Sequence, residues 1–100
     1  MQTQAQFESL WFSAKGPWIV YFTAAWCKAC KNLNIDTISE IAFNKNIPFY
    51  ICDDTENDYT AGYCGVRVFP TFIYFSGSKK IGSQISNNNT EIVSEWLKSL

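Results

Sequence analysis

The strongest constraint on the fold is a run of residues, 18–24 (WIVYFTA), in which β-branched and aromatic side chains follow one another almost without a polar interruption. Such a run is typical of a strand that is covered on both faces, as a central parallel strand is. Two cysteines, Cys27 and Cys30, follow it. Because open α/β sheets place their functional sites at the carboxyl ends of strands, the sequence predicts a site at these cysteines.

Helical and extended patterns alternate along the rest of the chain. Thr3 and Gln6 fit a capping box that starts a first helix, which Gly16-Pro17 ends. The elements predicted after the cysteines are a helix over residues 31–44, a buried strand over 49–53, a short weak helix over 57–63, strands over 71–75 and 80–86, and a final helix carrying residues 92–100. This order gives parallel pairing first, a closing antiparallel hairpin and helices on both sides of the sheet. We therefore expect one α/β domain over residues 1–100, a three-layer α/β/α sandwich around a mixed four-stranded sheet.

Composition argues against several classes of protein. Of the 100 residues, 47% are hydrophobic and 17% aromatic, which argues against a disordered chain. A net charge of −1 without a block of basic residues argues against a nucleic-acid partner. No apolar run approaches the roughly 20 residues of a membrane span, and no signal-peptide pattern opens the chain, so we expect a soluble, unexported protein with no membrane association. The acidic residues in segment 53–58 are interpreted as a solvated loop.

The cysteine pair has three interpretations. A structural zinc site needs four ligands, but the chain has no histidine, and Cys52 and Cys64 stand in different predicted elements. We therefore predict no metal. A structural disulfide is also disfavoured, because closing so short a loop removes little entropy from the unfolded chain. The third interpretation, a redox-active pair, fits the position best.

A redox pair needs one cysteine that ionises easily. Cys27 is predicted at the start of a helix, where unpaired N–H groups and the helix dipole favour a thiolate over a thiol. Lys28 and Lys31 add positive charge nearby, which makes Lys28 the candidate for tuning the cysteine pKa. Because the thiolate is the form that attacks a disulfide, we expect Cys27 to be the nucleophile. Cys30, one turn deeper on the same face, is expected to resolve the mixed disulfide.

The residues around the cysteines resemble a known family. Segment 22–31 (FTAAWCKACK) resembles the active-site segment of the thioredoxin family, and segment 69–72 (FPTF) resembles its cis-proline loop. The resemblance covers nearly the whole chain and implies the thioredoxin fold. It also implies that Cys27 is the exposed, attacking cysteine and that Cys30 is the buried, resolving one.

The same resemblance assigns a substrate-binding role to three further residues. Trp26 would shield the pair and form part of the docking surface. Pro70 would follow a cis peptide bond and face the disulfide, and Phe69 would offer backbone hydrogen bonds to an extended substrate segment. Of the remaining cysteines, Cys52 is expected in the core. Cys64 is expected to be a tolerated small residue, with a regulatory role, as in some family members, as the alternative.

The sequence departs from the family pattern at four places. Lys28-Ala29 replaces the usual Gly-Pro between the cysteines, a dipeptide that helps to set the redox potential. Tyr21 stands where relatives have a buried aspartate, so Cys30 is expected to lose its proton through water or Lys28. Ile35 replaces a proline that kinks the second helix in relatives, which predicts a straighter helix. The family's first strand is reduced to Met1-Gln2 or absent, which leaves four strands.

These features predict a thiol–disulfide oxidoreductase that reduces protein disulfides through Cys27 and Cys30 and needs no bound cofactor. Its expected partners are disulfide-containing proteins and a thioredoxin-reductase-like electron donor. We expect a monomer in the cytoplasm, which would be a host cytoplasm if the chain is viral or from a phage. Two alternatives stay open: a thioredoxin-fold electron relay, oxidase or isomerase for exported proteins, and a thioredoxin-fold binding or accessory subunit whose redox pair is incidental.

Overall fold

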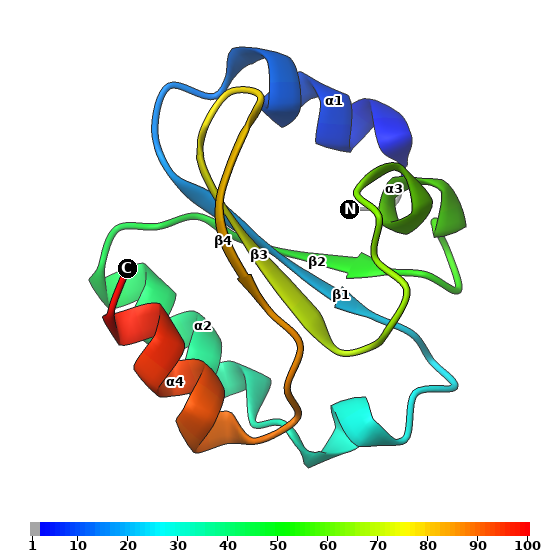
Figure 1. The fold of residues 1–100 in the computed structure, drawn as a ribbon, viewed down its shortest axis with the longest axis vertical. Coiled ribbons are helices and arrows are strands. Elements are labelled where there is room, and N and C mark those ends of the chain that lie inside the picture. Colours follow the sequence, from blue (N-terminus) through cyan, green and yellow to red (C-terminus); the bar gives the residue numbers. More distant parts are fainter. Residues whose placement is uncertain (1–2) are drawn as a thin grey trace.

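The computed structural model describes residues 3–100 and contains a mixed β-sheet between two layers of helices (Figure 1). In chain order the elements are α1 (Gln4–Ser13), β1 (Trp18–Thr23), the 3-10 helix η1 (Ala29–Asn32), α2 (Ile35–Asn44), β2 (Phe49–Asp53), α3 (Asp58–Tyr63), β3 (Thr71–Gly77), β4 (Lys80–Ile85) and α4 (Thr90–Lys98). The strands of the described part lie in the order β2-β1-β3-β4. Helices α1 and α3 cover one face of the sheet, and α2 and α4 cover the other. The predicted three-layer fold is confirmed, while Met1-Gln2 lies outside the described residues.

Strand β1 lies inside the sheet and is buried on both faces. Trp18, Val20 and Phe22 belong to the core beneath α1 and α3. Ile19 and Tyr21 belong to the core beneath α2 and α4. This arrangement confirms the prediction of a strand covered on both sides. The pairing differs from that of a central parallel strand, because β1 runs parallel to β2 but antiparallel to β3.

Helix α1 begins with the predicted capping box. The Gln6 N–H donates to Thr3 Oγ1 at 3.3 Å, and the Thr3 N–H donates to Gln6 Oε1 at 3.2 Å. One turn further, Phe7 is fully buried, and its ring centroid lies 5.7 Å from those of Trp18 and Phe75. Phe7 therefore anchors α1 on the sheet.

The helix predicted over residues 31–44 is interrupted, because η1 and α2 are separate helices. Between them Asn34 caps α2: its Oδ1 accepts the Thr37 N–H at 3.2 Å. The Asn34 N–H donates to Thr90 Oγ1, at the start of α4, at 2.9 Å. The expectation of a straighter helix from Ile35 is therefore wrong, since an asparagine cap sets the break without a proline. Within residues 3–100, every helix is too short or too polar to cross a bilayer.

Two cysteines remain free thiols, Cys52 on β2 and Cys64 after α3. Cys52 is fully buried, as predicted, and Cys64 is half-buried against the same core. Burial raises the pKa of Cys52 to about 11 and the pKa of Cys64 to about 12. Both thiols are therefore protonated near neutral pH and behave as small apolar side chains.

Replacing Phe7 with alanine should lower the free energy of unfolding by about 3–5 kcal/mol, because the change leaves a cavity among the surrounding rings. Urea unfolding followed by tryptophan fluorescence measures this difference. Phe12→Ala is the matched control on the same helix, since its ring is 57% exposed and its loss should cost less than about 1 kcal/mol. Equal losses for the two variants would contradict the anchoring role of Phe7.

The raised pKa values predict slow labelling of Cys52 and Cys64 in the folded, oxidised protein. At pH 8, iodoacetamide should modify each thiol at less than about one tenth of the rate in urea-unfolded protein, because only the thiolate reacts. Mass spectrometry counts the labelled sites, and fast labelling of the folded protein would contradict the prediction.

The raised pKa values of Cys52 and Cys64 should also lower the free energy of unfolding as the pH rises above 9. Unfolded thiols ionise around their ordinary pKa of 9.0, whereas the folded thiols ionise only near 11 and 12.

Candidate active site

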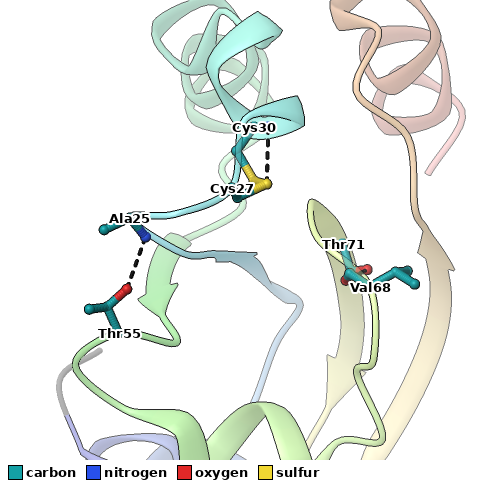
Figure 2. Close-up of a disulfide and its surroundings, with 6 residues drawn as sticks. All are labelled: Ala25, Cys27, Cys30, Thr55, Val68 and Thr71. Carbon is teal, nitrogen blue, oxygen red and sulfur yellow. Dashed lines mark hydrogen bonds between the residues drawn. A yellow bond between two sulfur atoms is a disulfide. The ribbon is translucent and has the colours of Figure 1, made fainter.

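The cysteine loop starts where β1 ends and is held by hydrogen bonds to its backbone. The Cys27 N–H donates to the Ala24 carbonyl at 3.0 Å, which closes a turn. The Ala25 N–H donates to Thr55 Oγ1 at 2.9 Å (Figure 2). The Thr55 N–H in turn donates to Asp53 Oδ1 at 2.9 Å, so the segment after β2 supports the loop. Sequence reasoning missed Thr55, because nothing in its local pattern points to a partner so distant along the chain.

Cys27 and Cys30 form a disulfide, with their Cα atoms 5.4 Å apart (Figure 2). The Cys30 N–H donates to Cys27 Sγ at 3.1 Å. When the pair is reduced, a donor at this place favours a thiolate on Cys27. The predicted long helix beneath Cys27 is absent, because η1 spans only Ala29–Asn32 before the chain breaks. The helix dipole is therefore that of a single turn, and the N–H of Cys30 is the more direct contact.

The expected contrast in exposure between the two cysteines is wrong for the disulfide form. Cys27 is 5% exposed and Cys30 is 7% exposed. The bonded sulfurs lie side by side, and the pair packs with Ala24 and against Phe69. Lys28, between the cysteines, is exposed. The geometry thus encloses both sulfurs and leaves the cationic side chain in solvent.

Trp26 and Phe69 form an apolar surface beside the disulfide. The Trp26 side chain is exposed, and the rings meet edge to face with centroids 5.5 Å apart. The Trp26 ring therefore lies at the surface and not in the core. The Phe69–Pro70 peptide bond is cis, as predicted, and its loop, marked by Val68 and Thr71, lies across from the disulfide in Figure 2. The structure brings all the predicted site residues to the end of the sheet where β1 finishes and β3 begins.

Tyr21 occupies the position where the family resemblance places a buried carboxyl group. Its ring is 4% exposed and stacks on Phe72 with the centroids 4.7 Å apart. Burial raises the pKa of the Tyr21 hydroxyl, a hydrogen bond with Thr23 lowers it, and the charge of Asp53 raises it again. The phenol therefore stays neutral near pH 7 and provides no base to the cysteines.

Comparisons with known sequences agree with this geometry. A family model described as thioredoxin matches residues 1–99. Thioredoxin of Gallus gallus is 30% identical over 82 residues, which are 82% of this chain and 77% of that protein. The chloroplastic thioredoxin M2 of Arabidopsis thaliana is 36% identical over 75 residues, and the match covers 73% of this chain but 40% of that longer protein.

Solved structures give the same result. The crystal structure of thioredoxin from Trypanosoma brucei brucei has a TM-score of 0.81 and 25% identity, and the match covers 99% of this chain and 86% of that one. Family membership and the cysteine disulfide together support thiol–disulfide oxidoreductase chemistry. On the extent of these matches, the chain belongs to the thioredoxin family.

Proposed function

We propose that the protein is a protein-disulfide reductase that works by dithiol–disulfide exchange through Cys27 and Cys30. The observation that supports this proposal most is the disulfide at the end of β1 with a backbone N–H directed at Cys27 Sγ, 3.1 Å away. Within residues 3–100, no hydrogen bond reaches the sulfur of Cys30. This asymmetry favours negative charge on Cys27 and supports its assignment as the attacking residue.

The proposed reaction consists of two exchanges. The Cys27 thiolate attacks one sulfur of a substrate disulfide, the substrate S–S bond breaks, and the other substrate sulfur leaves as a thiolate. The Cys30 thiolate then attacks Cys27 Sγ, which breaks the mixed disulfide and releases the second substrate thiolate. The substrate gains two electrons and, on protonation, two protons. Cys27 and Cys30 give up the same number and form their disulfide.

The Cys30 thiol has to lose its proton without a buried carboxylate. Tyr21 is a neutral phenol whose pKa is raised by burial, so it does not accept a proton. We propose that solvent accepts it when substrate exchange opens the cysteine pair. Lys28, exposed beside the pair, contributes positive charge that stabilises the thiolates at this stage.

Substrates are proposed to dock on Trp26, Phe69 and Pro70. The exposed Trp26 ring offers apolar contact area, and the cis-proline loop offers backbone groups to an extended segment. The proposed substrates are disulfide-containing proteins. A thioredoxin-reductase-like donor would return two electrons to the disulfide, and the chain would act as a monomer and as one domain in the cytoplasm.

Cys30→Ser should accumulate a covalent mixed disulfide with a disulfide-bonded protein such as insulin, because Cys27 still attacks and no thiol resolves the product. Cys27→Ser should trap little, and both variants should lose catalytic turnover. Non-reducing electrophoresis and mass spectrometry identify the adducts. Cys64→Ser is the control and should reduce insulin at the wild-type rate. Trapping by the Cys27→Ser protein alone would reverse the assignment of the two roles.

The redox potential of the Cys27–Cys30 couple should distinguish a reductase from an oxidase. A reductase requires a potential near that of thioredoxin, about −270 mV, whereas a strong oxidant such as DsbA lies near −120 mV. Equilibration with glutathione buffers, followed by tryptophan fluorescence, gives the value. A potential at the oxidising end would reject the reducing direction and favour the oxidase alternative.

A further inference from the structure

A groove opens beside the disulfide, between the cis-proline loop and the segment that joins β4 to α4. It has a volume of about 360 Å³. Its lining residues are Ala29, Val68, Phe69, Pro70, Ser86, Asn87 and Asn88. Two of the lining residues, Ala29 and Phe69, also pack against the cysteine pair, so the groove adjoins the disulfide. Figure 2 shows the orange segment after β4 running beside the loop that carries Val68 and Thr71.

The two walls of the groove differ in chemistry. The proline-loop wall consists of Val68, Phe69 and Pro70, whose side chains are apolar. The polar wall consists of Ser86, Asn87 and Asn88 from the segment after β4, whose side chains carry a hydroxyl and two amides. None of the lining residues carries a charge. Uncharged hydrogen-bonding side chains therefore belong to the polar wall alone among the residues that line the groove.

Hydrogen bonds hold the polar wall against the proline loop. The Thr71 hydroxyl, which is buried, donates to the Val68 carbonyl at 2.7 Å. A hydroxyl has one proton, so in the 2.7 Å contact between Thr71 Oγ1 and Ser86 Oγ the donor is Ser86. Ser86 is thereby fixed relative to the proline loop, with its lone pairs left as acceptors.

The asparagine amides are available for a ligand. Asn87 Oδ1 accepts the N–H of Asn89 at 2.8 Å, which holds the side chain and leaves the Nδ2 donor group. Within residues 3–100, neither Asn87 Nδ2 nor the amide of Asn88 has a hydrogen-bond partner. Asn88 is exposed, so a segment that covers it would remove its water. A bound aliphatic side chain would leave the amide without a partner, whereas a polar one would replace the lost water.

We propose that Asn87 and Asn88 determine substrate specificity: they select extended segments that carry an uncharged hydrogen-bonding side chain (Ser, Thr, Asn or Gln) next to the attacked cysteine, over segments with an aliphatic side chain there. The proposal rests on the reductase function proposed above and names its substrate class. The apolar wall and Trp26 serve any extended segment, while the asparagine wall discriminates between segments.

The test uses pairs of disulfide-linked peptides. The two peptides of a pair are identical except that one carries Asn and the other Leu, two side chains of similar size, at the same position. One pair varies the first position before the peptide's cysteine, and a second pair varies the second position. The prereduced full-length protein is mixed with each peptide, and kcat/KM or the single-turnover rate is measured. For wild type, we expect the Asn peptide to react roughly 3- to 10-fold faster than the Leu peptide at one position, the range expected for one net hydrogen bond.

Three variants make the result specific. Asn88→Leu should bring the Asn/Leu rate ratio to about 1, and Asn88→Gln, which keeps the amide, should retain the preference. Asn44→Leu, at the far end of α2, is the matched control and should keep the wild-type ratio. A structural role for Asn88 would lower both rates equally and leave the ratio unchanged, which would overturn the proposal.

The outcomes separate this proposal from the function on which it rests. If the wild type reduces insulin but treats the Asn and Leu peptides alike at both positions, the specificity proposal is wrong and the reductase function stands. If it reduces neither insulin nor any peptide, both are wrong. A preference for the Asn peptide that Asn88→Leu removes supports both.

Discussion

The antiparallel register of β1 against β3 is the constraint on which the site depends. Two aromatic pairs secure it, one on each face of the sheet. Trp18 stacks on Phe75 with ring centroids 4.0 Å apart, and Tyr21 stacks on Phe72 at 4.7 Å. In each pair the two residues stand directly opposite each other across β1 and β3. Such aromatic pairs stabilise a folded protein by about 0.5–1.5 kcal/mol each beyond the effect of the area that they bury. In this register the end of β1 meets the start of β3, which brings the cysteine loop and the cis-proline loop together.

Hydrogen bonds from distant segments then define each loop. Thr55 accepts from the cysteine loop, Thr90 accepts from the break before α2, and Ser86 donates to the residue after the proline. All three are hydroxyl side chains outside the cysteine motif. The position of the disulfide therefore depends on the segment before α3, on the segment before α4 and on the start of α4, as well as on β1.

Much of the fold follows from local patterns. The apolar run from residue 18 predicts a strand covered on both faces, Thr3 and Gln6 predict the capping box, and the alternation of elements predicts the layers. The helix after the cysteines was predicted as continuous because its apolar spacing fits one helix, yet the Asn34 cap divides it. An asparagine inside a helical pattern is compatible with a continuous helix and with a break at that residue. Here the Asn34 N–H donates to Thr90 Oγ1 on α4, and this contact favours the break.

The candidate site divides in the same way. The cysteine spacing, the preceding strand and the family resemblance identify Cys27 and Cys30 from the amino acids alone, because they are properties of neighbouring residues. The similar burial of Cys27 and Cys30, the support of the cysteine loop by Thr55 and the groove beside the proline loop came only from the folded chain. They depend on contacts between residues far apart in sequence, and strand register and loop packing, which local patterns do not encode, set those contacts.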